Sequence, residues 1–102
     1  MAAQTTQADT FTALSDCFTA DLAALIGDEP PHDVAPNTFI DLVERVRDVL
    51  ASSSMGNWQD AGEDLDSAVT YLTDALTDPG ADRPVLLARA RIHLRDGIET
   101  AS

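Results

Sequence analysis

The sequence predicts an all-α fold, a four-helix bundle of antiparallel helices in a single domain. Three observations predict it. Apolar residues recur every three or four positions in four stretches, breaks rich in proline, serine or glycine separate those stretches, and 102 residues suffice for one core without a disulfide or a metal. We expect the helices at about residues 9–26, 38–51, 58–77 and 84–99, after an N-terminal tail of residues 1–8.

The first helix, residues 9–26, carries an apolar stripe over about a third of its circumference. The stripe consists of Phe11, Leu14, Phe18, Leu22, Leu25 and Ile26. Asp9 and Asp16 lie opposite it, and Gly27 can end the helix in a left-handed conformation. Cys17 falls just outside the stripe. We expect it to be half-buried packing rather than a nucleophile, because no base is placed to activate it.

Residues 28–37 form a linker with three prolines, which lack the backbone N–H and restrict the residues before them. The segment is longer than an ordinary helix-to-helix turn. We expect a spacer that crosses the end of the bundle, and a short extended segment for recognition is the alternative. Glu29 and His32 match the Glu-x-x-His spacing of di-iron bundles, but the two prolines between them prevent a shared helical face. We therefore expect no metal.

The second helix, residues 38–51, has an inner face made of Phe39, Leu42, Val43, Val46, Val49 and Leu50. Asn37 or Thr38 is expected to cap its N-terminus. Asp41 and Arg45 are spaced to form an ion pair across one turn, with the acid in the favourable N-terminal place. A polar turn at residues 52–56 ends this helix.

The third helix, residues 58–77, has the clearest periodicity of the four. Its inner face consists of Trp58, Ala61, Leu65, Ala68, Val69, Leu72 and Leu76. Small residues at positions 61 and 62 predict that a neighbouring helix approaches closely beside Trp58. Pro79 ends the helix, because it disfavours helical backbone at Asp78. Tyr71 points away from the inner face, as a surface aromatic or as part of a partner contact.

The fourth helix, residues 84–99, is apolar on two sides. Its main stripe consists of Leu86, Leu87, Ala90, Leu94 and Ile98. Val85 and Ile92 lie nearly opposite that stripe, with Arg89 and Arg95 flanking them. Such a helix is either central in the packing or half of an interface, and 102 residues leave little second layer to bury it. We predict that these four residues contact a second chain.

The chain is strongly acidic, with 18 Asp and Glu against 6 Arg, no Lys and a formal net charge of −12. Residues 1–82 contain 16 acids and 2 Arg, whereas residues 83–102 contain 4 Arg and 2 acids. Nucleic acid and anionic membranes are repelled by such a surface, so neither is expected to bind directly. The acidity suits a basic partner, and it is explained equally well by solubility or a salt-rich cytoplasm.

We expect a non-enzymatic protein–protein interaction module, an adapter or assembly subunit that binds itself or a partner through the fourth helix. The alternative is an acidic mimic of nucleic acid that inhibits a DNA-binding or DNA-cleaving protein. Mimicry needs a dense strip of carboxylates, which requires the outer faces of the second and third helices to lie side by side. The candidate acidic face consists of Asp41, Glu44, Asp48, Asp60, Glu63, Asp64 and Asp74.

The sequence contains no pattern typical of catalysis or of phosphate binding, and neither His32 nor His93 has an evident nucleophile to serve. We therefore expect no enzyme and no cofactor. A lone cysteine and the lack of a long apolar stretch favour a cytoplasmic protein. The third possibility is an enzyme or small-molecule binder with a pocket near Trp58 and Tyr71.

Overall fold

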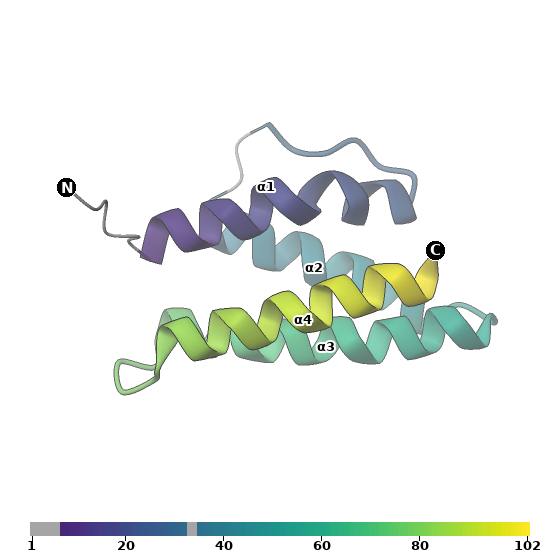
Figure 1. Cartoon of the computed structure of the whole chain (residues 1–102). Coiled ribbons are helices and arrows are strands. Elements are labelled where there is room, and N and C mark those ends of the chain that lie inside the picture. The colour runs from purple at the N-terminus through teal and green to yellow at the C-terminus, as the bar shows by residue number, and fades with distance from the viewer. Residues whose placement is uncertain (1–6, 33–34) are drawn as a thin grey trace.

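A computed structural model describes residues 7–32 and 35–102 of the chain. These residues form four helices and no strand: α1 (Gln7–Leu25), α2 (Pro36–Ala51), α3 (Gly56–Thr77) and α4 (Arg83–Ala101) (Figure 1). The predicted four-helix bundle is confirmed, and each helix begins and ends within two residues of its expected bounds. The first six residues of the predicted tail lie outside the described residues, and residues 7 and 8 belong to α1.

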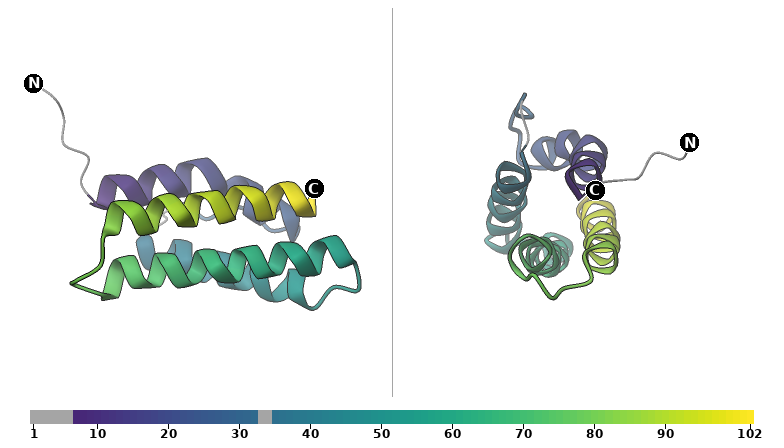
Figure 2. Two further views of the ribbon diagram at one scale, coloured as in Figure 1. Left: turned by 60° about the horizontal axis from the view of Figure 1, so that its bottom comes forward. Right: turned by 90° about the vertical axis from the view of Figure 1, so that its left-hand side faces the viewer.

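The four helices form a square when the bundle is seen end on (Figure 2). α1 packs against α2 and α4, and α3 packs against the same two helices. The largest fully buried side chains come from all four helices and are Leu22, Phe39, Val43, Val46, Leu50, Leu65, Leu72 and Leu94. Burial stabilises each of them by about 1.5–3 kcal/mol relative to exposure. Val49, predicted to face inward, is 41% exposed, because it lies at the edge of its stripe.

α1 ends at a glycine with left-handed backbone, as the sequence predicts. Gly27 has a φ of 74°. The N–H of Asp28 donates to the carbonyl of Ala23 at 2.9 Å, and the N–H of Gly27 donates to the carbonyl of Ala24 at 3.2 Å. These two bonds satisfy carbonyls that the end of a helix leaves without partners, and they reverse the direction of the chain.

Residues 28–32 of the linker run back along α1, and α1 and α2 point in the same direction (Figure 1). Pro30 and Pro31 lie beside Thr12 and Ser15 in the first half of α1. The expected antiparallel arrangement holds for α2 with α3 and for α3 with α4, whereas α1 is parallel to both of its neighbours, α2 and α4. About ten extended residues reach roughly 33 Å, enough to return past the roughly 28 Å of α1. The long linker therefore follows the side of the bundle instead of crossing its end.

An ion pair links the linker to the middle of α2. Arg45 Nη2 lies 3.2 Å from Asp28 Oδ2, so Arg45 pairs with the linker and not with Asp41 as expected. α2 begins at Pro36, with Ala35 in the N-cap position and no side-chain cap. The capping role expected of Asn37 or Thr38 is absent because a proline with its φ already restricted starts the helix.

At one point α3 and α4 pack so closely that a side chain in place of hydrogen would require its neighbours to shift. A Cβ atom on Gly97 would lie 3.1 Å from Leu65 Cδ2 and 3.3 Å from the carbonyl oxygen of Ala61. At the same end of the bundle the indole N–H of Trp58 donates to the carbonyl of Ala101 at 2.9 Å. The close approach predicted beside Trp58 is confirmed. α4 makes it at Ala61, and the end of α2 makes it at Gly62, where a Cβ atom would lie 3.1 Å from the backbone nitrogen of Ala51.

Candidate interaction surface

The outer face of α4 carries apolar side chains that the bundle does not cover. Val85 is 42% exposed and Ile92 is 49% exposed, and exposed Ala88 shares their helical face. We call these three residues the α4 strip. Among the described residues, only Val49 and Met55 are other large apolar side chains of comparable exposure. The second apolar side predicted for α4 is therefore present, and it faces solvent.

A groove between α1 and α4 adjoins the α4 strip. The α1–α4 groove has a volume of about 760 Å³ and is lined by Ala13, Leu14 and Cys17 of α1 and by Pro84, Leu87, Ala88, Arg91, Ile92 and Arg95 of α4. Among the side chains that the structure describes, residues 11–32 and 35–102, no carboxylate lines it. Ala88 and Ile92 belong both to the groove and to the strip. The two features therefore form one continuous surface along α4.

The arginines of α4 lie on different sides of the helix. The guanidinium carbon of Arg89 lies 5.9 Å from the centre of the Tyr71 ring, so Arg89 faces α3. Arg95 lines the α1–α4 groove, and its Nε lies 3.8 Å from Asp96 Oδ1. Both partners of that ion pair are about half exposed, so it contributes little stability. The two arginines expected to flank one interface therefore face opposite seams.

Two residues of the groove differ from the sequence-based expectation. Arg91 was not predicted, although its spacing of four residues from Arg95 places both on one side of α4. Arg91 makes no ion pair with any residue in the ranges that the structure describes. Cys17 is exposed instead of half-buried, because α1 and α4 are not closed over it. The groove thus holds an unpaired cation that sequence reasoning missed.

The opposite seam, between α3 and α4, is closed by polar and aromatic contacts. His93 Nδ1 lies 3.2 Å from Asp64 Oδ1, and the His93 ring stacks on Tyr71 with 5.6 Å between the ring centres. Asp64 therefore turns toward α4 and does not belong to an outer acidic face. Neither Tyr71 nor Trp58 borders the α1–α4 groove, the hollow beneath the linker or the hollow at the α3–α4 turn.

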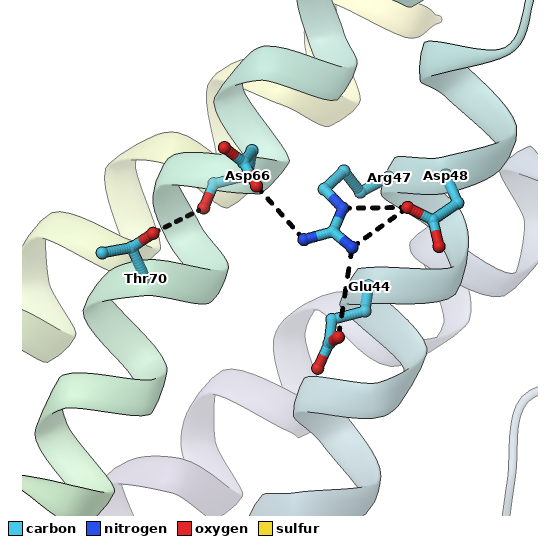
Figure 3. A network of polar contacts seen from close by, with 5 residues as sticks. All are labelled: Glu44, Arg47, Asp48, Asp66 and Thr70. Atoms are coloured by element: carbon cyan, nitrogen blue, oxygen red, sulfur yellow. Dashed lines mark hydrogen bonds and ion pairs between the residues drawn. The ribbon is translucent and has the colours of Figure 1, made fainter.

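Carboxylates of α2 and α3 gather around Arg47 (Figure 3). Arg47 lies 3.0 Å from Asp48, 3.1 Å from Asp66 and 4.0 Å from Glu44. Burial by itself lowers the pKa of Arg47, but the hydrogen bond and the charge of Asp48, together with Asp66, outweigh it and raise the pKa above its ordinary value. Asp66, which was not among the predicted acidic residues, thus joins two that were.

The other predicted acidic residues, Asp41 on α2 and Asp60, Glu63 and Asp74 on α3, are exposed and form no ion pair within the described part of the chain. Because α2 and α3 are neighbours, carboxylates of both helices do lie on one side of the bundle. That side differs from the predicted one in two ways. Asp64 contacts His93 of α4 and does not lie on that side, and the cation Arg47 does lie there.

The linker covers a polar hollow of about 380 Å³ on α1. Its lining consists of Thr12, Ser15, Asp16, Thr19, Ala20, Pro30, Pro31 and His32. The Thr19 hydroxyl is buried there and has no hydrogen-bond partner in the described structure. Over the same ranges, no three His, Cys, Asp or Glu side chains are grouped to hold a metal ion, and none of the helices has the length and apolar character needed to cross a bilayer.

Comparison with known proteins finds no protein family, no curated protein and no solved structure that matches this chain. The surface must therefore be interpreted from its own chemistry.

Proposed function

We propose that this chain is a non-enzymatic protein–protein interaction module that binds through α4, either to a second copy or to a partner protein. One observation carries the proposal: Val85 and Ile92 are nearly half exposed on one helical face beside an apolar groove that contains Arg91 and Arg95. Apolar side chains with arginine beside them are typical of interface centres. A cytoplasmic location fits the exposed lone thiol of Cys17, which would be open to oxidation outside the cell.

The chain offers a matched control for this proposal. Val85→Asp with Ile92→Asp places two charges on the α4 strip. Val49→Asp with Met55→Asp places the same two charges on apolar residues of similar exposure, 41% and 47%, that belong neither to α4 nor to the lining of the α1–α4 groove. Because all four side chains are nearly half exposed, both double variants are expected to keep the helical content and the unfolding midpoint close to those of the wild type.

The experiment compares the three proteins by sedimentation equilibrium and by affinity capture from the source organism, with the captured proteins identified by mass spectrometry. We expect the α4 double variant to lose self-association or capture of a defined partner, and the control variant to keep it. The proposal would be contradicted if the two variants showed the same self-association and captured the same partners. It would also be contradicted if the wild type were a monomer and captured no partner that the α4 double variant fails to capture.

A second candidate function rests on the α2–α3 carboxylates. Glu44, Asp48 and Asp66 lie on neighbouring helices around Arg47. Exposed Asp60 and Glu63 precede Asp66 on α3. Such a surface suits a mimic that occupies the basic groove of a DNA-binding protein. The test is capture on DNA-binding proteins of the same organism in 0.05 M and 0.5 M NaCl. Mimicry requires binding that falls steeply with salt and is lost in Asp60→Asn with Glu63→Gln.

A further inference from the structure

We propose that the α1–α4 groove receives an amphipathic helix of a partner protein, with apolar side chains on the groove floor and two carboxylates, about one turn apart, against Arg91 and Arg95. The inference rests on the proposed function, because it names the chemistry of the partner that the α4 surface would bind. Charge, backbone chemistry and the shape of the groove each support it.

The charge of the groove selects an acidic partner. Arg91 has no ion-pair partner among the described residues, and Arg95 has only the long contact to Asp96. None of the described residues that line the groove is a carboxylate, although the chain as a whole carries −12. Arginine side chains form strong paired hydrogen bonds with carboxylates. The groove is therefore the place on this acidic protein where an acidic segment gains attraction instead of repulsion.

The walls of the groove select a helix. Every lining residue belongs to α1 or α4, so the backbone groups of the walls are already used within those helices. An extended peptide on this floor would find few free N–H or carbonyl groups for its own backbone. A helix satisfies its backbone internally and offers only side chains to the groove. Arg91 and Arg95 are four residues apart, about 6 Å along the axis, which matches two carboxylates at i and i+4 of a partner helix.

A second copy of this chain fits the groove less well. A two-fold dimer built on the groove would bring Arg91 and Arg95 of one copy toward the same residues of the other, and like charges at an interface are unfavourable. A small amphiphilic carboxylate also fits less well, because the groove is open to solvent and continues onto the exposed Val85, where an enclosed ligand would have no contact.

The test uses a displayed library of 18-residue helices in which the apolar stripe is kept and the flanking positions are randomised among Glu, Lys, Gln and Ala. Selection is against the full chain, and recovered peptides are synthesised and titrated by fluorescence anisotropy. We expect recovered helices to carry two Glu one turn apart beside the apolar stripe. Recovery of basic or neutral helices, of no helix, or of peptides whose NMR shift changes map to α2 and α3 would overturn the proposal.

Two variants of the groove make the test specific. Arg91→Gln with Arg95→Gln should weaken binding of the acidic helix about tenfold, since two charge contacts are lost. Arg91→Glu with Arg95→Glu should weaken it further, and a peptide with Lys in place of the two Glu should bind this variant better than it binds the wild type. Equal affinity of the acidic helix for the wild type and both variants would overturn the proposal. Sodium dodecanoate is the small-ligand control. The proposal would also be overturned if dodecanoate bound the wild-type groove more tightly than any recovered helix and displaced no helix from the variants.

The failure of this inference is distinguishable from the failure of the proposed function. If the partner captured through Val85 and Ile92 still binds the Arg91→Gln, Arg95→Gln protein with unchanged affinity, α4 is an interaction surface but its partner is not an acidic helix. If the Val85→Asp, Ile92→Asp variant loses nothing, the proposed function itself fails.

Discussion

The two seams of α4 are built differently, although they lie on either side of one helix. Toward α3, Gly97 permits backbone contact, Trp58 donates to Ala101, and His93 meets Asp64. Toward α1, the same helix borders an open groove of about 760 Å³ that contains Arg91 and Arg95. One side of α4 therefore has its polar groups paired within the fold, and the other side leaves two cations facing solvent.

This difference separates residues that hold the bundle together from residues that are free to bind. Small residues, a partly buried indole hydrogen bond and the partly buried contact of His93 with Asp64 at the α3 seam serve packing within the chain. At the α1 seam, closing the groove would have needed larger residues than Ala13 and Ala88. If the comparison is right, substitutions at the α3 seam reduce the free energy of unfolding, and substitutions in the groove leave it nearly unchanged.

The largest effect is expected for Gly97→Val. Its added side chain would meet Leu65 and the carbonyl oxygen of Ala61, which is backbone and cannot move aside at low cost. We expect a loss of about 2–3 kcal/mol in the free energy of unfolding, measured by urea denaturation and circular dichroism.

The comparison substitution in the groove is Ala88→Val, which adds two methyl groups to the same helix on its exposed side. We expect its free energy of unfolding to stay within about 0.5 kcal/mol of the wild-type value. Equal losses in the two variants would mean that the α1 seam is packed as tightly as the α3 seam, and the comparison would fail.

A smaller effect is expected for Trp58→Phe. Phenylalanine keeps an aromatic ring in the core but cannot donate to the carbonyl of Ala101, so we expect a loss of about 1–1.5 kcal/mol. Asn57→Ala removes the neighbouring bond to the carbonyl of Thr100, 3.1 Å long and exposed, and serves as the control. It should cost less than half as much, because water replaces an exposed partner. A reversed order of the two losses would contradict the role of the indole.

The polar contact of the α3 seam should be measurable as a coupling energy. In a double-mutant cycle of His93→Gln and Asp64→Asn, we expect a coupling of about 0.5 kcal/mol, since each side chain is about one-third exposed. The same cycle on Arg95 and Asp96 should give a value near zero, because that contact is 3.8 Å long and more exposed. Equal couplings would remove the electrostatic difference between the two seams.

The sequence predicted the helices well because each one repeats its apolar residues over three or more turns, and the breaks at Gly27 and Pro79 have a direct backbone cause. The exposure of Val85 and Ile92 followed from the same periodicity. Periodicity on one helix, however, does not say which helix lies beside it. Parallel α1 and α2 depend on the path of the linker, which local patterns do not encode.

The same limit explains why residues of the candidate site that look alike in the sequence have different neighbours in the bundle. Arg89 and Arg95 looked equivalent on a helical wheel, yet Tyr71 of α3 lies under Arg89 and only the groove lies under Arg95. In the sequence, Asp64 looks like the other acidic residues of its helix. In the bundle it contacts His93, which lies 29 positions later in the chain. Such pairings between distant residues appear only once the helices are packed.

The smallest effect on stability is expected for the pair of substitutions most important for binding, Arg91→Gln with Arg95→Gln. Neither arginine has a close carboxylate partner in the described part of the chain, so the fold loses only the screening that two cations give a chain of charge −12. We expect a loss of at most about 0.5 kcal/mol, which should shrink further in 0.5 M NaCl. Urea denaturation at both salt concentrations measures it, with Arg47→Gln as the contrast, because Arg47 contacts three carboxylates and should cost more. A loss above about 1 kcal/mol for the groove pair would mean that these arginines stabilise the bundle. The α1 seam of α4 would then contribute to stability and would no longer differ from the α3 seam in this respect.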